Sequence, residues 1–409
     1  MTLQTALSGL LGAQTGLNTV SNDLANASTT AFKSQTALFS DIYPANQSNV
    51  PGIGVATSAI TSDLTQGSLV ATGNPLDAAI QGNGYFVVSE NGQQQYTRDG
   101  SFQLNTQGQL VSATGAQVMG YAQTAAGTLS ATLSPITVNT GALGANPTGT
   151  LGLTLNLNSG DPVIPATTAF NAADPTTYDE ATSVVAYDSL GNANRVGLYF
   201  VQNPAAVGGA GTPSWTVYAQ PETAGGAAIG TPQTLTTLNF STSGQLSSGS
   251  PASLNVAWGN GAANSAIQFN LTGTTMGAQG FAVAGITNDG YQPGNYSGTT
   301  ISSTGGLVST YSNGQTLSAG SLSLANFINP NGLQPVTGNL FAASQTSGQP
   351  VLDVAGTGQA GLVSGGNLEQ SNASTSSLLV SLIQYQQAYQ ANTSVIQTEQ
   401  QDSTRLTQI

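Results

Sequence analysis

The first 27 residues place apolar side chains at every seventh position, the pattern of a helix that packs against another helix. Two series of residues three positions apart form this seam: Leu3, Leu10, Leu17 and Leu24, with Ala6, Ala13, Val20 and Ala27. The same stretch contains Gly9, Gly12 and Gly16. Each glycine destabilises a helix by roughly 1 kcal/mol relative to alanine, so an isolated helix is not expected here. We predict a helix over residues 3–27 that depends on packing against other segments.

The C-terminal segment carries a second helical stripe. It contains no glycine or proline from Ser371 onward, and its apolar residues recur at spacings of three and four. This face consists of Leu378, Leu382, Tyr385, Tyr389, Ile396 and Leu406. The spacing predicts a long helix over residues 375–405. Two arrangements remain open for the terminal helices, a hairpin within one chain or packing between molecules, and the N-terminal glycines favour packing between molecules because small residues let neighbouring helices approach closely.

Between the two ends the sequence has the character of a β protein. Short runs of β-forming residues alternate with turn signals, as in YFVVSENGQQQYTRDGSFQLNTQGQLV. Asn91-Gly92, Asp99-Gly100 and Gln107-Gly108 separate the expected strands. The 51 glycines and 17 prolines are spread along the chain, so they indicate turns and not a disordered linker. No fixed repeat is present, which argues against a β-solenoid.

The length and the composition along the chain predict several domains. Residues 151–287 are the richest in alanine, glycine, threonine and serine and contain both tryptophans. We expect a mostly β fold with two β-rich domains, one inserted in the other, and a terminal α-helical coiled-coil domain in which the two ends pair. The expected boundaries are 1–30 with 366–409 for the helical domain, 31–71 with 356–365 for a connecting region, 72–145 with 288–355 for the first β domain, and 146–287 for the outer β domain.

The charge balance excludes several classes of partner. The chain has 17 acidic residues, four basic residues and no histidine, for a net charge of -13. Nucleic acid is an unsuitable partner because phosphate binding requires clustered lysine and arginine. We also expect no membrane insertion and no cleaved signal peptide, since polar residues interrupt every apolar run. Only 5% of residues are charged, so the surface could be buried against other copies of the chain with little ionic desolvation.

The sequence offers few groups for catalysis. Without histidine or cysteine, Ser-His and Cys-His nucleophiles and thiolate metal sites are excluded. The stretch GNGYFV at residues 82–87 lacks the rest of a phosphate-binding loop, so we interpret it as a turn before a strand. The acidic residues Asp174, Asp179, Glu180 and Asp188 leave three possibilities, a solvated loop, a weak calcium site or paired catalytic carboxylates. We predict no catalytic, cofactor or metal site.

Three blocks of sequence resemble the bacterial flagellar rod, hook and hook-associated axial protein family. The N-terminal block is SGLLGAQTGLNTVSNDLANASTTAFKS, the second is NPLDAAIQGNGYFVV with QYTRDGSFQLNTQGQLV, and the third is GGNLEQSN followed by LIQYQQAYQANTSVIQT. The residues that match the family motifs are Asn22, Ala25, Asn26, Phe32, Lys33, Leu368, Glu369, Ser371 and Asn372. Ala31 and Asn367 depart mildly from the pattern, where many relatives carry glycine and alanine.

Two further stretches are similar to the hook subunits within this family. They are SVVAYDSLGNANRVGLYFVQ at residues 183–202 and YSNGQTLSAGSLSLANFINPNGLQPVTGNLFAASQTSGQP at residues 311–350. No motif is recognised from about residue 203 to 287, and the contacts of that segment are not predicted. Three alternatives remain: a rod or hook-associated axial subunit, a secreted β-rich enzyme that acts on polysaccharides, and a solitary adhesin whose two ends form a closed hairpin.

The resemblance implies an extracellular structural subunit that polymerises with copies of itself into a flexible helical tube. Such a tube joins the flagellar rod to the filament as a universal joint, and its subunits have domains named D0, D1 and D2. The implied partners are the distal rod protein, the hook cap, the hook-filament junction protein and the flagellar type III export apparatus. In this class the terminal helices pack among many neighbours, so we expect them to become ordered when the subunits assemble.

Overall fold

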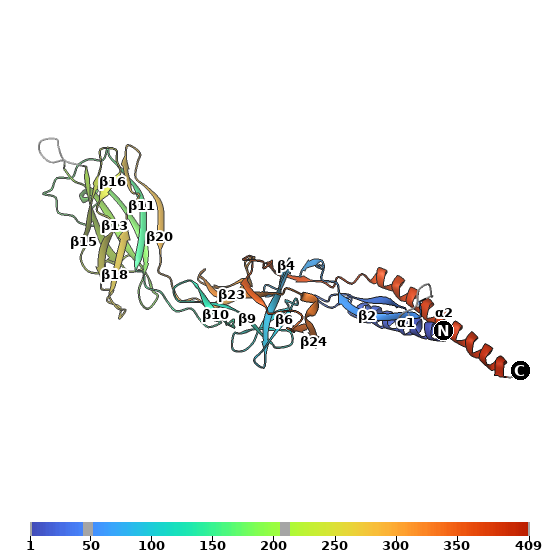
Figure 1. The fold of residues 1–409 in the computed structure, drawn as a ribbon. Coiled ribbons are helices and arrows are strands. Elements are labelled where there is room, and N and C mark those ends of the chain that lie inside the picture. The colour runs from blue at the N-terminus through green and yellow to red at the C-terminus, as the bar shows by residue number, and fades with distance from the viewer. Residues whose placement is uncertain (1, 44–51, 205–212, 408–409) are drawn as a thin grey trace. The chain divides into compact units, whose positions relative to one another are not determined.

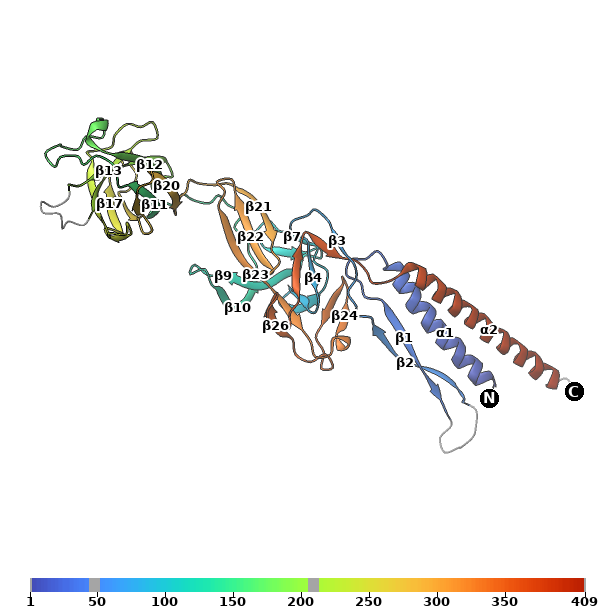
Figure 2. The same cartoon turned by 90° about the horizontal axis from the view of Figure 1, so that it is seen from above.

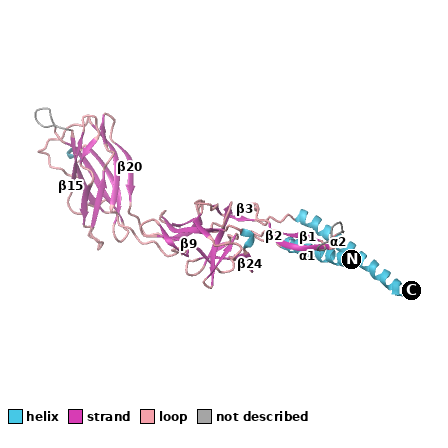
Figure 3. Cartoon of the chain, in the orientation of Figure 1, coloured by secondary structure: helices cyan, strands magenta, loops and turns pink. Residues whose placement is uncertain are grey.

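The computed structural model describes residues 2–43, 52–204 and 213–407 of the chain (Figure 1). Strands make up most of its regular structure, and a long helix lies near each end (Figure 3). The chain divides into two units. Unit 1 consists of Met1–Thr140, Gly298–Thr310 and Thr316–Ile409, and unit 2 of Gly141–Ser297 with Tyr311–Gln315. The mostly β class with paired terminal helices is therefore confirmed.

The two helices lie side by side in opposite directions (Figure 2). Helix α1 spans Thr2–Ala25 and helix α2 spans Thr375–Thr407. The predicted range 3–27 was wrong at its end, because Ala27 lies in a turn beyond α1. The Asn26 side-chain amide donates to the carbonyl of Asn22 at 3.0 Å, and the Ala27 N–H turns to the Leu24 carbonyl, three residues back, at 3.4 Å. An asparagine side chain that competes for backbone groups in this way ends a helix.

The glycines of α1 mark its closest contacts within the same chain. A Cβ atom added at Gly16 would overlap the ring of Tyr385, and one added at Gly9 would lie 2.8 Å from the Asn392 side-chain oxygen. Both of these partners belong to α2. The third glycine, Gly12, faces Phe39 and Val55, which lie on the paired strands β1 (Gln35–Ile42) and β2 (Gly54–Ser62). Close approaches inside the subunit therefore explain Gly9 and Gly16, and the contacts between molecules that we inferred from the glycines stay a prediction.

Unit 1 contains one large sheet and three small antiparallel pairs. The pairs are β1 (Gln35–Ile42) with β2 (Gly54–Ser62), β28 (Asn367–Glu369) with β3 (Leu69–Ala71), and β27 (Leu362–Gly365) with β4 (Ala78–Gln81). The large sheet comprises β5 (Tyr85–Glu90), β6 (Gln93–Thr97), β7 (Phe102–Leu104), β8 (Leu110–Ser112), β9 (Gln117–Gln123), β10 (Leu129–Pro135), β21 (Tyr296–Ile301), β22 (Gly306–Tyr311), β23 (Thr316–Asn326), β24 (Gln334–Val336), β25 (Leu340–Ala342) and β26 (Val351–Val354). Two of the small pairs join segments from opposite ends of the chain, which brings residues 69–81 and 362–369 together.

The predicted turns are found between the strands of this sheet. Asn91 and Gly92 join β5 to β6 with φ angles of 51° and 80°, the left-handed values that an Asn-Gly hairpin turn requires. Gly82 and Gly84, with φ angles of 95° and 122°, immediately precede β5. The interpretation of GNGYFV as a turn before a strand is thus confirmed.

Unit 2 is a sandwich of two five-stranded sheets that share one hydrophobic core. The first sheet comprises β11 (Thr150–Asn158), β17 (Ala252–Val256), β18 (Ser265–Asn270), β19 (Thr275–Gly277) and β20 (Ala282–Asn288). The second comprises β12 (Glu180–Tyr187), β13 (Ala193–Gln202), β14 (Ser214–Glu222), β15 (Gln233–Phe240) and β16 (Leu246–Ser248). Buried and partly buried residues alternate along β11, as expected for a strand with one face in the core. Trp215 and Trp258 are both buried in this core.

Candidate functional site

Three of the motif residues, Lys33, Glu369 and Asn372, come together where the helices join the β structure. We call Lys33, Thr65, Arg98, Glu369 and Asn372 the root cluster. They come from the segment after α1, the loop before β3, the turn after β6, strand β28 and the segment before α2. Hydrogen bonds and ion pairs connect all five. Residues far apart in the sequence are therefore fixed to one another at this point.

One buried carboxylate binds two cations in the root cluster. The Lys33 ammonium lies 2.6 Å from Oε1 of Glu369, and Nε of Arg98 lies 3.0 Å from Oε2. The Glu369 side chain is completely buried, and those of Lys33 and Arg98 are 3% and 7% exposed. Both cations also donate to backbone carbonyls, Lys33 to that of Thr65 at 2.7 Å and Arg98 to that of Gly82 at 2.7 Å. Each charge thus has a partner, which is the condition for burying it.

The electrostatics of Lys33 depend on Glu369. Burial lowers the pKa of the Lys33 ammonium, while the hydrogen bond to Glu369 and its negative charge act in the opposite direction. The nearby Arg98 charge lowers this pKa further. Removing one partner from a buried ion pair typically costs about 3–5 kcal/mol, because the remaining charge has neither water nor a counter-ion. Loss of Glu369 would leave two like charges in that position.

Asn372 connects the segment that follows α1 to the segment that precedes α2. Its side-chain amide donates to the carbonyls of Asp63 and Thr65 at 2.9 and 3.1 Å, and its oxygen accepts from the backbone N–H of Ser34 at 2.8 Å. The adjacent Ser371 hydroxyl accepts from the N–H of Ala373 at 3.1 Å. A single side chain therefore ties the N-terminal segment, the 63–65 loop and the start of α2 together.

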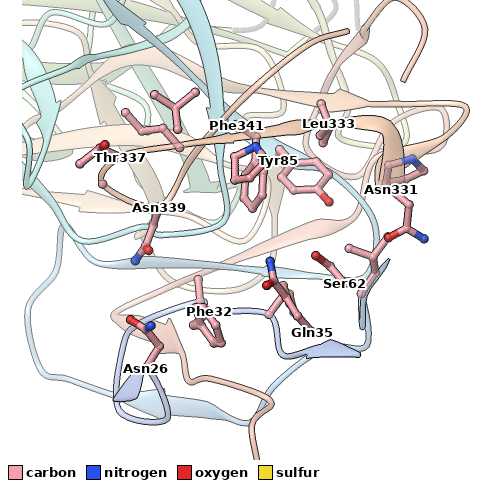
Figure 4. Close-up of a pocket in the computed structure, with 18 of the residues that line it drawn as sticks. Asn26, Phe32, Gln35, Ser62, Tyr85, Asn331, Leu333, Thr337, Asn339 and Phe341 are labelled. Atoms are coloured by element: carbon pink, nitrogen blue, oxygen red, sulfur yellow. The ribbon is translucent and has the colours of Figure 1, made fainter. Parts of the chain in front are cut away.

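The other motif residues lie around this cluster. Ala25 is the last residue of α1, Asn22 and Asn26 form the turn that ends it, and Leu368 pairs with Val70 between β28 and β3. Phe32 lines a cavity of about 790 Å³ between the root cluster and the large sheet (Figure 4).

The described residues that line the cavity carry mostly amide, hydroxyl and apolar side chains, and none of them carries a carboxylate. Tyr85 and Phe341 point into it from the sheet, and Asn26, Phe32 and Gln35 face them from the N-terminal segment (Figure 4). The Lys33 ammonium reaches the wall but is held by Glu369. This chemistry suits a packing surface and supplies no acid-base pair.

The two predicted helical seams differ in burial along their length. In α1, Ala6, Ala13 and Val20 are buried, Leu10, Leu17 and Leu24 are half-buried, and Leu3 is 48% exposed. In α2, Leu378, Leu382, Tyr385 and Ile396 are half-buried, Tyr389 is exposed, and the side chain of Leu406 lies outside the described residues. Neither helix, within the described residues, has an apolar stretch long enough to span a bilayer.

Sequence reasoning missed a second apolar face on both helices. On α1 it consists of Leu3, Leu7 and Leu11, which are 48–55% exposed. On α2 it consists of Leu379, Val380 and Ile383, which are 49–56% exposed. The available signal was the adjacent pair Leu10-Leu11 and the run Leu378–Val380, because an apolar residue next to a seam position points away from the partner helix. Paired α1 and α2 therefore still present apolar surface to solvent.

The acidic residues of unit 2 stabilise turns. Asp174 caps the short helix Pro175–Thr177 through the Thr176 N–H, and Asp179 accepts from the N–H of Gln202 at 2.7 Å. The Asp188 side chain is buried and accepts several hydrogen bonds, including one from Asn260 at 2.6 Å. In the described part of the chain, no three acidic side chains come together as metal ligands. These contacts give each of the three aspartates a structural explanation.

Asp23 is a buried carboxylate beside the root cluster. Its Oδ2 accepts from the Gln35 N–H at 2.9 Å, whereas Oδ1 has no hydrogen-bond donor among the described residues. Burial raises the pKa of this carboxyl, although the hydrogen bond from Gln35 opposes the shift. The folded chain therefore holds the proton more tightly than the unfolded chain does, and the stability falls as the pH rises from the unfolded pKa through the folded one.

We predict that Asp23→Asn raises the midpoint of thermal unfolding at pH 7, because the amide keeps an acceptor for Gln35 and buries no charge. The difference from the wild type should disappear at about pH 3, below the ordinary pKa of about 3.9 for an aspartate. Calorimetry at both pH values measures it. Asp41→Asn, an exposed change on β1, is the matched control and should leave the midpoint unchanged. A lower midpoint for Asp23→Asn at pH 7 would contradict the prediction.

Comparisons with known families define the class of protein to which this arrangement belongs. Residues 79–150 match the family described as "Flagellar hook protein FlgE/F/G D1 domain", and residues 156–291 match "Flagellar basal body protein FlaE D2 domain". Residues 364–409, which contain α2 and Glu369, match "Flagellar basal body rod FlgEFG protein C-terminal". The chain is thus an axial protein of the bacterial flagellum.

Among the axial proteins of the flagellum, the similar relatives are hook proteins. The flagellar hook protein FlgE of Escherichia coli (strain K12) is 36% identical over 98% of both chains, and that of Brucella suis biovar 1 (strain 1330) is 33% identical over 97% of this chain and 95% of its own. The chain belongs to the flagellar hook protein family and is a structural subunit of the hook. The crystal structure of the Helicobacter pylori flagellar hook protein FlgE2 shares the fold, with a TM-score of 0.57, 14% identity, and coverage of 75% of this chain and 99% of that one.

Proposed function

We propose that this subunit polymerises into a flexible helical tube that couples the flagellar rod to the filament as a universal joint. The observation that carries the proposal is the apolar face that α1 and α2 keep exposed after they pair. Full burial of one leucine-sized side chain contributes roughly 1.5–3 kcal/mol, and the six exposed residues are about half buried already, so they could supply roughly 5–9 kcal/mol to subunit association. Copies of the chain can meet there without desolvating ions, since neighbouring surfaces carry few charges.

The domain roles follow the same proposal. Residues 1–30 with 366–409 act as D0 and form the wall of the inner tube, residues 31–71 with 356–365 connect it, residues 72–145 with 288–355 act as D1, and residues 146–287 act as D2 on the outside. The outer domain has one cationic residue, Arg195, which donates to the Ser183 hydroxyl at 2.6 Å. Contacts between outer domains therefore have few strong ion pairs to break, and several arrangements of nearly equal energy would let the tube bend.

The subunit would also bind other flagellar proteins and be exported by the flagellar apparatus. We infer binding to the distal rod protein at one end of the tube, to the hook-filament junction protein at the other, and to the hook cap during growth. Export would use the flagellar type III apparatus without a cleaved signal peptide, and no catalytic activity is assigned to the subunit.

Circular dichroism tests the link between assembly and helix order. We expect the helical signal of the dilute subunit to be small and to rise on polymerisation, because the contact between the 24-residue and 33-residue helices within one chain leaves apolar residues of both exposed, and these are buried only among neighbouring subunits. The β signal should stay constant, since the strands belong to cores within one chain. Full helicity at a concentration where sedimentation shows only monomers would contradict the proposal.

A further inference from the structure

The root cluster contains two of the four basic residues of the chain, and both bind one carboxylate. Glu369 is 336 residues from Lys33 and 271 residues from Arg98 in the sequence. The two ion pairs therefore connect the N-terminal segment, the large sheet and the C-terminal segment. Oε1 of Glu369 also accepts from the N–H of Gly67 at 2.9 Å, which adds the loop before β3.

The backbone strengthens the same connection. The Ala31 N–H donates to the Glu369 carbonyl at 2.8 Å, and the Ser34 N–H donates to the Asn372 side chain at 2.8 Å. Arg98 also lies over the ring of Tyr85, with its guanidinium carbon 5.9 Å from the ring centroid. Neither chain end can thus leave the cluster without exposing or orphaning polar groups that belong to the other end.

We infer that Glu369 is a latch that makes the ordering of the two chain ends against the large sheet a single cooperative step. The latched root, residues 31–37, 63–67 and 367–372, is already folded in the unassembled subunit, and only α1 and α2 become ordered on assembly. The second part of this inference rests on the proposed function. Glu369 acts as a positioning residue, because it lies where the chain leaves α1 and enters α2 and makes no part of their exposed apolar surface.

Hydrogen exchange measured by mass spectrometry on the dilute, full-length subunit tests the latch. In the wild type, peptides covering the latched root should be protected while those of α1 and α2 exchange rapidly. Glu369→Gln leaves the Lys33 and Arg98 charges unpaired, so exchange should accelerate by roughly 100-fold or more in residues 31–37 and 63–67, the size expected for a broken buried ion pair. The N-terminal and C-terminal parts of the root should loosen together.

Two variants separate a latch from general destabilisation. Lys33→Met leaves the Glu369–Arg98 pair neutral, so its effect on the root should be much smaller than that of Glu369→Gln. Glu90→Gln, at the end of β5, changes a glutamate outside the cluster and should leave root exchange as in the wild type. Peptides from β9 and from unit 2 should remain protected in all three variants, because they belong to other contacts.

The inference is overturned if wild-type root peptides exchange as fast as the helices, if Glu369→Gln loosens only residues 367–372, or if Lys33→Met is equally damaging. Assembly is followed separately by sedimentation and electron microscopy. A chain that shows the latch but forms no tubes would refute the proposed function and leave the latch standing. Tubes formed by a chain whose root shows no cooperative protection would refute the latch alone.

Discussion

Gly16→Ala should reduce the assembly equilibrium constant of the hook subunit by tenfold or more. The added methyl group would overlap the ring of Tyr385, which lines the contact between α1 and α2. Overpacking of this kind typically destabilises a contact by about 1–3 kcal/mol. Alanine stabilises a helix by roughly 1 kcal/mol relative to glycine, but this gain counts only if α1 stays packed against α2. The polymer yield from sedimentation, with the helical signal from circular dichroism, measures the effect.

Two changes act as controls for Gly16→Ala. A Cβ atom at Gly12 would lie 3.3 Å from Cγ1 of Val55 and 3.6 Å from the Phe39 ring, so Gly12→Ala should leave assembly near the wild-type level or improve it slightly. Adding Tyr385→Ala to Gly16→Ala removes the overlap and should restore part of the lost assembly. Equal assembly of the Gly16→Ala variant and the wild type would show that the helices do not pair as described.

Replacing residues 147–290 with a short flexible linker should leave a chain that still forms tubes, with altered curvature. The chain enters and leaves this segment through two antiparallel bridges, Leu143 with Gly294 and Asn146 with Tyr291. Their backbone hydrogen bonds of 2.7–3.0 Å hold the cut ends side by side, so a short linker can close the gap. The excised sandwich has its own hydrophobic core, made only of residues within it, and the core of the large sheet loses no member.

Electron microscopy measures the curvature of tubes formed by the deletion variant and compares it with that of tubes formed by the full chain. Straight or differently curved tubes would support the assignment of bending to the outer domain. The absence of tubes, in a variant whose remaining strands are folded by circular dichroism, would mean that the outer domain also builds the tube and would refute that division of roles.

Local patterns were sufficient to predict much of the fold. The seven-residue repeat and the 3-4 stripe predicted both helices, and Asn91-Gly92 predicted a hairpin turn, because these signals depend on residues a few positions apart. The end of α1 was missed at Ala27, where the heptad continues but side-chain hydrogen bonds of Asn26 stop the helix. Periodicity records which faces are apolar and carries no information about such competition for backbone groups.

The contacts that define the site could not be predicted in the same way. Lys33 and Glu369 were recognised as motif residues, but nothing within either segment indicates that one carboxylate serves two cations from distant positions. The sequence also did not indicate whether the glycines of α1 contact the same chain or another molecule, because small residues permit close packing in both cases. Asp188 was grouped with its acidic neighbours by proximity in the sequence, whereas its partner Asn260 comes from a different part of the sandwich.

Burial of the root cations has a consequence for resistance to proteases. Trypsin-like enzymes cleave after lysine and arginine, and this chain offers only Lys33, Arg98, Arg195 and Arg405. The first two are sealed inside the root cluster, so an intact subunit presents only Arg195 and Arg405 as exposed points of attack. Within the described residues, the hook subunit thus exposes very few bonds that such enzymes can cleave.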